Sequence, residues 1–509
     1  MDRVSSHDES LRQVLPVVGV ALLARLVLAA LIPLFPDETY YWEWSRRLAG
    51  GYFDHPSAIA VLIAAGTRTA ALFGVAPLPF VVRVVPVIAG AVAALFAALI
   101  AGRLAGPAAA RTAAVIFAVM PLAASGLVIA TPDIPLLAAN AIAVYGVVRA
   151  LQSQPRSREA AGWWTLGGIF LGASFASKYT SILLPGTLFV GMLLRRSTRA
   201  RLAEAGPWLA CVAAILVFLP VLRWNAGHDW ISFSFQIQHG LGTPTGSALK
   251  REGDLLGGQL GLVSPILFVL IAAAVWQTLR NRADDVRFLL AAIAVGSWVF
   301  FGYSALRRSV EANWPAPAYI PAVALLAALP GSPARERWVK RGIALGGLVV
   351  ALIYIHAVVP LLPLKARRDP IARSAGWDGL ASSVEKMSGT LSGHTYVGAD
   401  RYQDVSELAY HLQGRPTTFC TCLTGRRNQY ELWPGFAQTA HPGDNLVLSL
   451  EDTSSGAASP KLLAPYFAVV AEGEIVPLLR GGDTVAVRRL WALRNYREGW
   501  PTRTAVDAR

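Results

Sequence analysis

Long apolar runs recur along most of the chain, and they constrain its fold more than any other feature. A membrane-spanning helix needs about 20 predominantly apolar residues. Runs of this kind alternate with short polar loops as far as residue 363. The residues are 54% hydrophobic and only 15% charged, whereas ordinary soluble proteins are about 25% charged. We therefore predict a polytopic α-helical membrane protein, and the composition excludes a disordered or collagen-like chain.

About eleven of these runs are predicted to be spanning helices. Their ranges are 13–35, 80–102, 109–127, 134–151, 162–177, 180–194, 207–223, 255–278, 287–304, 315–330 and 342–363. The apolar stretch 57–74 is interrupted by Arg68, and we predict that it lies at the membrane interface instead of crossing. No cleavable signal peptide is expected, because an acidic and aromatic segment follows the first span in place of a small-residue cleavage site.

The distribution of basic residues predicts the orientation of the helices. If the N-terminus lies in the cytoplasm, every cytoplasmic loop is rich in arginine, as the positive-inside rule requires. These loops carry Arg103 and Arg111, then Arg149, Arg156 and Arg158, then Arg195, Arg196, Arg199 and Arg201, then Arg280, Arg282 and Arg287, and finally Arg335, Arg337, Lys340 and Arg341. An odd number of spans then places the C-terminal segment outside. Because the net charge of +14 is spread over these loops and forms no patch, nucleic-acid binding is not expected.

The last segment, about 365–509, has the composition of a soluble domain. Polar residues return there, and the apolar runs shorten to the length of strands. The predicted strands are His394–Ala399, Pro416–Cys420, Asn445–Leu450, Phe467–Val470 and Thr484–Val487, with helices at Gly376–Met387 and Val405–Leu412. We therefore predict a transmembrane module over 1–364 and a small α/β domain over 365–509, which is large enough for its own core.

The three cysteines are too few for a disulfide framework. They are Cys211, Cys420 and Cys422, and a single residue separates the last two. Such close spacing works against the geometry of a disulfide. No bridge between Cys420 and Cys422 is therefore expected.

The first outward loop carries polar groups that membrane insertion does not require. Asp37 and Glu38 directly follow the first span, and an aromatic stretch with Tyr41 and Trp42 comes next. One interpretation is structural: Asp37 caps an interfacial helix, and the aromatic side chains form a membrane belt. The other is functional: Asp37 is a carboxylate held at the membrane to act on a lipid-linked substrate. The two are compatible, because a cap fixes the orientation of the carboxylate.

Three short motifs follow in other outward loops. Asp54 and His55 are interpreted as substrate contacts; a divalent metal there is a weaker alternative, and no metal ligands are assigned. Asp133 either favours a helix start through its charge or belongs to an acidic site. Lys178, followed by Tyr179, is the only lysine in the first 249 residues. It either snorkels to the membrane surface or holds a phosphate there.

Two later outward loops add further cations and aromatic residues. Their candidate substrate-binding residues are Arg223, Trp224, His228, Arg307, Arg308, Glu311 and Asn313. Arg308 and Glu311 are three residues apart, which is also the spacing of a plain surface ion pair. Cations on the outer side run against the positive-inside tendency, and a negatively charged ligand explains them better than topology does. We expect these loops to converge on one outer face.

The order of these motifs resembles that of a known enzyme class. The stretches are Asp37-Glu-Thr-Tyr-Tyr-Trp, Gly51-Tyr-Phe-Asp-His-Pro, Thr131-Pro-Asp-Ile-Pro-Leu, Ser177-Lys-Tyr-Thr, Trp224-Asn with His228-Asp-Trp, and Glu311-Ala-Asn-Trp-Pro-Ala-Pro. Together they resemble the lipid-dependent glycosyltransferases of the GT-C class. The most similar branch is the bacterial one related to the protein O-mannosyltransferases and the lipid A aminoarabinose transferase.

The resemblance implies a GT-C fold in the bacterial inner membrane, with two interfacial helices in the first outer loop and a periplasmic C-terminal domain. It further implies an enzyme that moves a sugar from a polyprenyl-phosphate carrier to a lipid, glycan or protein acceptor. By this analogy Asp37 is the catalytic carboxylate, and Asp133 matches a second acidic position. Where the aminoarabinose transferase has Glu-Lys-Pro-Pro, this chain has Phe53-Asp-His-Pro-Ser, which argues against an aminoarabinose substrate.

The predicted mechanism gives each group a role. Asp37, helped by Glu38 or Asp133, orients the acceptor hydroxyl and takes its proton late in an inverting displacement. Lys178 with Arg223, Arg307 or Arg308 neutralises the departing lipid phosphate. Aromatic side chains stack on the sugar or line the carrier's entrance; they are Trp42, Tyr179, Trp224 and Trp314. No cofactor is assigned.

Three alternatives remain at this point. A flippase for a lipid-linked sugar would share the bundle and the lipid, but the polar residues concentrate in outer loops and no paired broken helices occur in two matching halves. A ligase or polymerase for whole glycan chains would differ in the size of its acceptor. A noncatalytic scaffold leaves the polar membrane loops unexplained.

Overall fold

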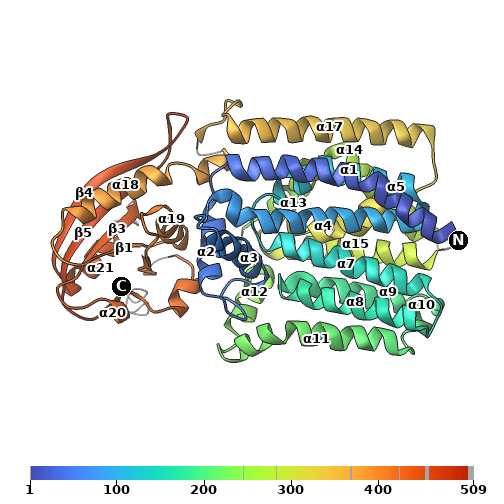
Figure 1. The fold of residues 1–509 in the computed structure, drawn as a ribbon, viewed down its shortest axis with the longest axis horizontal. Helices are drawn as coiled ribbons and strands as arrows, with labels where there is room; N and C mark the ends of the chain where they lie inside the picture. The colour runs from blue at the N-terminus through green and yellow to red at the C-terminus, as the bar shows by residue number, and fades with distance from the viewer. Residues whose placement is uncertain are drawn as a thin grey trace. The chain divides into compact units, whose positions relative to one another are not determined.

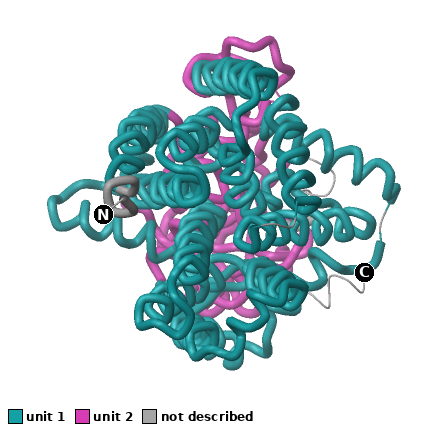
Figure 2. Tube along the Cα trace, turned by 90° about the vertical axis from the view of Figure 1, so that its right-hand side faces the viewer, with its two compact units in different colours: residues 1–31, 48–355 teal, residues 32–47, 356–509 magenta. Residues whose placement is uncertain are grey.

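The computed structural model describes residues 2–244, 246–281, 284–366, 369–423, 425–452 and 458–501, and the side chains of 2–7 and 458–459 are not considered (Figure 1). The chain forms two compact units (Figure 2). Unit 1 contains Met1–Leu31 and Leu48–Ile355, and unit 2 contains Ile32–Arg47 and His356–Arg509. The first-loop segment therefore belongs to the same unit as the C-terminal segment. The two domains inferred from composition, 1–364 and 365–509, stay a prediction.

Unit 1 is built from helices, as the apolar runs predict. In chain order they are α1 (Asp2–Leu31), α3 (Ala58–Leu72), α4 (Pro79–Ala105), α5 (Pro107–Val119), α6 (Pro121–Gly126), α7 (Asp133–Gln152), α8 (Arg158–Phe175), η1 (Tyr179–Ile182), α9 (Leu183–Leu193), α10 (Arg196–Arg201), α11 (Ala205–Ala226), α12 (Ile231–Leu241), α13 (Ala248–Val263), α14 (Pro265–Arg280), α15 (Asp285–Arg307), η2 (Ala316–Ala318), α16 (Tyr319–Ala327) and α17 (Pro333–Val358). A buried core of mostly alanine, leucine, valine and isoleucine joins α4, α5, α7, α14, α15 and α16.

Some helices of unit 1 are long and apolar enough to cross a membrane. Within the described ranges, six helices are long and apolar enough to cross a membrane: α1, α4, α7, α11, α15 and α17. Four shorter apolar segments lie at 58–72, 107–119, 179–193 and 316–327. All eleven predicted ranges contain helix, so the polytopic helical fold is confirmed. The exact number of spans stays a prediction.

One segment that was predicted to be a single spanning helix is instead sharply bent. The range 255–278 is divided between α13 and α14, which meet at an angle of 102°. Ser264 at the junction has a φ of 79°, and Pro265 begins the second helix. A left-handed residue followed by a proline without an N–H interrupts the helical hydrogen-bond ladder, so the chain turns there.

Small residues allow close packing between α8 and α11. A Cβ added to Gly168 would lie 2.2 Å from the carbonyl oxygen of Ala210, and one added to Gly172 would lie 2.5 Å from that of Ala214. Such contacts between backbones are a recurrent basis of helix association in membranes.

Gly168→Ala should therefore lower the thermal stability of the detergent-solubilised protein, because α8 and α11 must separate to admit the methyl group. Gly162→Ala is the matched control on the same helix, since its Cβ would meet no described atom within 4 Å. Replacing glycine by alanine at an open helical position gains up to about 1 kcal/mol. If Gly168→Ala melts at the same temperature as the unaltered protein, or at a higher one, the packing argument is contradicted.

The basic loops gather at one end of unit 1. Arg103 Nε donates to Gln152 Oε1 at 3.0 Å, and Arg201 donates to the carbonyl of Ala150 at 2.8 Å. Arg287 donates to the carbonyls of Leu104 and Ala328, each at 3.0 Å. These bonds connect the α4–α5, α7–α8, α14–α15 and α16–α17 junctions, at the end where α10 and the N-terminus lie in Figure 1. The loops that were predicted to be rich in arginine therefore lie together at one end of unit 1.

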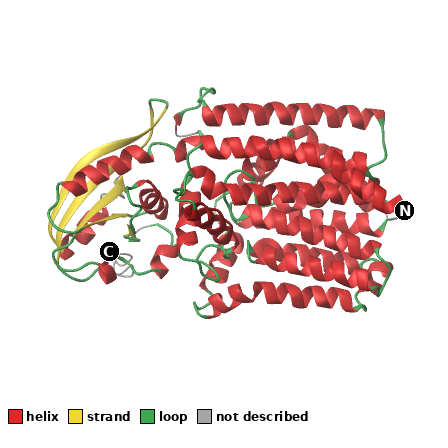
Figure 3. Ribbon diagram, in the orientation of Figure 1, coloured by secondary structure: helices red, strands yellow, loops and turns green. Residues whose placement is uncertain are grey.

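Unit 2 combines a mixed sheet with helices (Figure 3). Its elements are α2 (Pro36–Arg46), η4 (Pro370–Ser374), α18 (Trp377–Gly389), β1 (Thr395–Ala399), α19 (Tyr402–His411), β2 (Phe419–Cys420), η5 (Gln429–Leu432), α20 (Phe436–Thr439), β3 (Asn445–Glu451), α21 (Ala458–Leu463), η6 (Ala464–Tyr466), β4 (Phe467–Arg480) and β5 (Asp483–Tyr496). The strand order is β2-β1-β3-β5-β4, with β1 parallel to β2 and β3, and β5 antiparallel to β3 and β4. The predicted α/β class of this segment is therefore confirmed.

The strands β4 and β5 are much longer than predicted. Each has 14 residues, whereas the predictions covered only Phe467–Val470 and Thr484–Val487. The extensions contain charged residues such as Glu472 and Arg489, which pair across the hairpin. Because one face of an antiparallel hairpin can be solvated, apolar runs underestimate its length.

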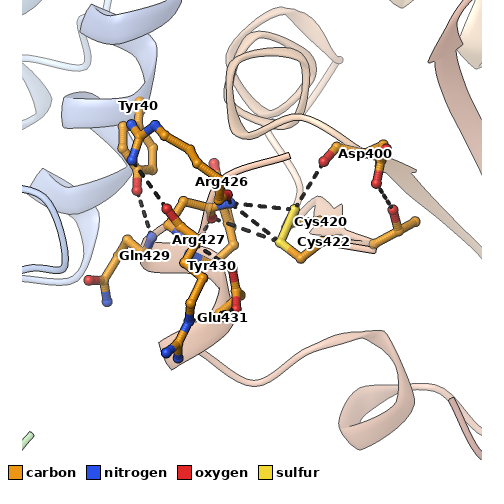
Figure 4. Close-up of a disulfide and its surroundings, with 11 residues drawn as sticks. Tyr40, Asp400, Cys420, Cys422, Arg426, Arg427, Gln429, Tyr430 and Glu431 are labelled. Atoms are coloured by element: carbon orange, nitrogen blue, oxygen red, sulfur yellow. Dashed lines mark hydrogen bonds and ion pairs between the residues drawn. A yellow bond between two sulfur atoms is a disulfide. The ribbon is translucent and has the colours of Figure 1, made fainter. Parts of the chain in front are cut away.

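The expectation for the cysteines is also wrong. Cys420 and Cys422 form a disulfide, with their Cα atoms 5.1 Å apart (Figure 4). Cys422 has a φ of 52°, which folds the chain back and brings the two residues within bridging distance despite their spacing. Cys211 is free and exposed.

Candidate active site

The first-loop helix α2 carries the acidic pair, and it packs on α19 inside unit 2 (Figure 1). Pro36 is its first residue, and Phe35 is the cap position. The Glu38 carboxylate accepts a hydrogen bond from the Phe35 backbone N–H at 3.0 Å, so Glu38 and not Asp37 closes the helix start. Asp37 instead accepts from the Tyr402 hydroxyl through Oδ1 at 3.2 Å. The interpretation that Asp37 caps this helix is therefore wrong.

The two carboxylates differ in exposure. Glu38 is fully buried, with 0% of its surface exposed, whereas Asp37 is half-buried. Tyr41 and Trp42 are also buried; Trp42 packs edge-on against Tyr410 with ring centroids 5.2 Å apart. The accessible acidic group of this loop is Asp37.

A buried acidic group lies below α2 on α19. Burial raises the pKa of Glu407 to about 7, the charges of Glu38 and Asp404 add to this shift, and contact with His411 opposes it. The His411 ring lies 3.2 Å from the Glu407 carboxylate and 2.6 Å from that of Asp378. Burial opposes the shift at His411, but these two acids raise its pKa above the ordinary value.

Unit 2 should therefore lose stability as the pH rises through about 7. A carboxyl group whose pKa is raised on folding stabilises the folded state at a pH below its ordinary pKa of 4.5. This contribution to the free energy of unfolding is lost as the pH rises from 4.5 to the folded-state pKa of about 7. The loss for Glu407 is on the order of 3 kcal/mol. Glu407→Gln mimics the protonated form, so thermal unfolding followed between pH 5 and pH 8 should show a weaker pH dependence. The exposed Glu474→Gln serves as control; equal pH dependence for Glu407→Gln and the unaltered protein would contradict the assignment.

In unit 1, three of the predicted site residues form one cluster, in which Lys178 and Asp133 are buried and Asn313 is half-buried. Lys178 Nζ lies 2.8 Å from Asp133 Oδ1, and Asn313 Nδ2 donates to Asp133 Oδ2 at 2.7 Å. The side chains of Lys178 and Asp133 are 8% and 12% exposed. The ammonium group also lies 5.7 Å from the centre of the Trp314 ring. Lys178 is therefore held by an internal partner, and the snorkelling interpretation is wrong.

The other outward loops meet in the same unit. Tyr179 donates to Ser232 Oγ at 3.0 Å and accepts from Asn225 Nδ2 at 3.1 Å. The side-chain amide of Gln236 donates to the backbone carbonyl of Asp54 at 2.6 Å. The N–H of Ala58, next to the His55 motif, donates to the carbonyl of Ala176 at 2.9 Å. These contacts and the Asp133 cluster join the loops at 54–58, 133, 176–179, 225–236 and 313, so the expected convergence holds for those within unit 1.

The predicted cations occupy different environments. Arg307 Nε donates to the carbonyl of Leu241 at 3.2 Å, and Arg308 lies against Gly242. Arg223 is exposed and lines a hollow of about 520 Å³ together with Gly50, Leu216, Leu219, Pro220 and Trp224. Trp224 stacks on His228 with ring centroids 4.1 Å apart. Glu311 is exposed. Arg223 thus combines an accessible charge with apolar walls.

Asp54 and His55, for which a metal was the weaker alternative, lie in a tight turn. Among the described residues, no group of three or more His, Cys, Asp or Glu side chains is placed to hold a metal ion. Asp54 and His55 are both part of the tight turn in which the Tyr52 N–H donates to the His55 carbonyl at 3.0 Å.

Several contacts of the site were not among the predicted site residues. Tyr402 lies 365 residues after Asp37, and Asn225 and Ser232 were not among the candidates. Asn225 lies within the Trp224–Trp230 stretch, which was a usable signal. No sequence feature marks Tyr402.

The helices of unit 1 and the mixed sheet of unit 2 are the parts of an ArnT-like GT-C fold. Residues 54–224 match the sequence family described as dolichyl-phosphate-mannose-protein mannosyltransferase. The structure is similar to that of ArnT from Cupriavidus metallidurans bound to undecaprenyl phosphate, with a TM-score of 0.65 and 17% identity over 95% of this chain and 98% of that one. The apo form of ArnT gives a TM-score of 0.63 and 16% identity, covering 94% and 97% of the two chains.

A curated relative is similar over most of both chains. The lipid A galacturonosyltransferase RgtD of Rhizobium johnstonii is 26% identical over 385 residues, which cover 74% of this chain and 78% of that protein. These findings confirm the resemblance to the GT-C class: the chain has an ArnT-like fold with several helices apolar enough to cross a membrane, and the proteins it resembles are glycosyltransferases.

Proposed function

We propose that this protein transfers a sugar from a polyprenyl-phosphate carrier to lipid A, or to a lipid with a similar headgroup, at the periplasmic face of the bacterial inner membrane. The observation that carries the proposal is the similarity over nearly the whole chain to a fold that binds undecaprenyl phosphate in ArnT. The relative RgtD acts on lipid A, and it supports a lipid as the acceptor.

The sugar that we propose is a hexuronic acid. RgtD, a galacturonosyltransferase, is 26% identical, whereas ArnT is 17% identical. The Glu-Lys-Pro-Pro stretch of the aminoarabinose transferase is replaced here by Phe53-Asp-His-Pro-Ser. The first observation favours an acidic sugar, and the second argues against aminoarabinose.

Asp37 is the proposed proton acceptor. It is half-buried, whereas Glu38 is fully buried and engaged at the helix start, so only Asp37 has an accessible oxygen for an acceptor hydroxyl. In the transfer, the hydroxyl oxygen forms a bond to the anomeric carbon as the bond from that carbon to the phosphate oxygen breaks. The phosphate leaves with the electron pair, and the hydroxyl proton passes to the Asp37 carboxylate.

The cations divide between two roles. Lys178 is paired with Asp133, which also accepts a hydrogen bond from Asn313, so we propose that this cluster presents the ammonium group in a fixed position to an anionic group of the substrate. Arg223 is accessible beside apolar side chains, as the headgroup of a lipid phosphate requires.

The orientation that we propose puts unit 2 in the periplasm. Its Cys420–Cys422 disulfide is of a kind that persists in the periplasm and is rare in the cytosol. The arginine-rich loops at one end of unit 1 are typical of a cytoplasmic face.

Mass spectrometry of lipids from cells with and without the protein tests this function. We expect a lipid A species whose mass is increased by one hexuronic acid residue only when the protein is present. Cells that carry the Asp37→Asn variant should resemble those without the protein. Identical lipid profiles in all three strains would refute the proposal, and a hexosamine or pentosamine increment would refute the proposed sugar alone.

A further inference from the structure

The first-loop helix is attached to the C-terminal segment by several direct contacts within unit 2. Thr39 Oγ1 and Ser406 Oγ are 3.0 Å apart, and Ser406 Oγ also donates to the Pro36 carbonyl at 3.3 Å. The Tyr402 hydroxyl donates to Asp37 Oδ1 at 3.2 Å. Of these contacts, only the one from Tyr402 reaches the carboxylate itself.

Tyr402 is held on both sides by its neighbours. Its ring centroid lies 4.5 Å from that of Tyr40 on α2, and the guanidinium carbon of Arg426 lies 4.5 Å from the ring centre on α19. A cation beside a phenol ring withdraws electron density and makes the hydroxyl a stronger hydrogen-bond donor.

The loop that supplies Arg426 is held at described residues on both sides of it. The Cys420–Cys422 disulfide closes its beginning, and Asn428 Nδ2 donates to Cys422 Sγ at 3.5 Å. The backbone N–H of Gln429 donates to the Tyr40 hydroxyl at 2.7 Å, as Figure 4 shows. The loop therefore connects back to α2, one turn after Asp37.

We propose that the C-terminal segment supplies a positioning residue for the transfer reaction: Tyr402, whose hydroxyl holds one oxygen of Asp37 and thereby orients the carboxylate toward the acceptor hydroxyl. The proposal rests on the proposed role of Asp37. It also gives the C-terminal segment a function beyond binding the acceptor or covering the site, because the Tyr402 hydroxyl restrains rotation of the Asp37 carboxylate about its Cβ–Cγ bond. A carboxylate that must find its orientation in each turnover reacts more slowly, although it binds the substrate equally well.

Tyr402→Phe removes the hydroxyl and keeps the ring between Tyr40 and Arg426. We expect kcat to fall about tenfold, as loss of a hydrogen bond to a charged group would cause. KM for the lipid-linked donor and for the lipid acceptor should stay unchanged. The reaction is measured with purified full-length protein, undecaprenyl-phosphate-linked galacturonic acid and lipid A.

Thr39→Val is the matched control, because it removes a hydrogen bond from the same α2–α19 contact without touching the carboxylate. It should keep the unaltered kcat. If Tyr402 only fastens the two helices together, both variants will lose activity equally and melt earlier, and the proposal is overturned. An unaltered kcat for Tyr402→Phe overturns it as well. If Asp37→Asn retains near-normal turnover, the proposed role of Asp37 fails; an inactive Asp37→Asn with a fully active Tyr402→Phe refutes the positioning role alone.

Discussion

Asp37→Asn is expected to reduce sugar transfer by at least a hundredfold while the protein still inserts and folds. The amide keeps the size of the carboxylate and can still receive the Tyr402 hydrogen bond through its oxygen, but it cannot take the proton of the acceptor hydroxyl. General base catalysis contributes about 10²- to 10⁴-fold in enzymes, and the loss should fall in this range. The effect is measured as the initial rate of product formation by the purified protein in detergent.

Two observations separate a chemical effect of this substitution from a structural one. The melting temperature of Asp37→Asn should stay close to that of the unaltered protein, because Asp37 is half-buried and Glu38 closes the helix start. Asp483→Asn, an exposed carboxylate of unit 2, serves as the control and should retain full activity. Near-normal transfer by Asp37→Asn would remove this residue from the mechanism.

Lys178→Met is expected to have the largest effect on stability. It leaves the Asp133 carboxylate buried without its cation, and Asn313 is the remaining hydrogen-bond partner among the described side chains. Breaking a buried ion pair in this way costs about 3–5 kcal/mol, so the protein should melt at a clearly lower temperature. The transfer rate should fall as well, because the fixed cation for the anionic group of the substrate is lost.

The double variant Lys178→Met with Asp133→Asn distinguishes the two effects. The double variant has no buried charge at either position, so its melting temperature should return most of the way to that of the unaltered protein. Its rate of sugar transfer should stay low. If it regains the unaltered transfer rate, Lys178 is only a structural partner of Asp133. If Lys178→Met alone melts as the unaltered protein does, the buried ion pair contributes no stability and the structural argument fails.

Much of unit 1 was predictable because the membrane imposes simple rules on a sequence. Apolar runs gave the positions of the helices, and arginine placement indicated which loops share an end. The polar groups of the outward loops also predicted that these loops converge, and Asp133, Lys178 and Asn313 do come together. The α13–α14 bend was missed because a window of hydropathy does not register a left-handed residue followed by a proline, as at Ser264–Pro265.

Unit 2 was less predictable, since its decisive contacts join distant parts of the chain. Asp37 and Tyr402 are 365 residues apart, and neither stands in a pattern that points to the other. From its composition alone, the first loop is predicted to form an interfacial helix. Its packing on α19 depends on side chains such as Thr39 and Ser406. Threonine and serine occur throughout the chain, so these residue types do not mark a contact. The Cys420–Cys422 bridge depends on the backbone at Cys422, which spacing does not reveal.

The most direct test of the account is a transfer assay with purified protein in detergent, with labelled galacturonic acid on undecaprenyl phosphate as donor and lipid A as acceptor. The account predicts labelled lipid A together with an equal amount of free undecaprenyl phosphate, and neither product with the Asp37→Asn variant. A flippase or a scaffold would leave the labelled donor intact. Recovery of the intact donor after prolonged incubation with both substrates would contradict the central claim that this chain is a sugar transferase.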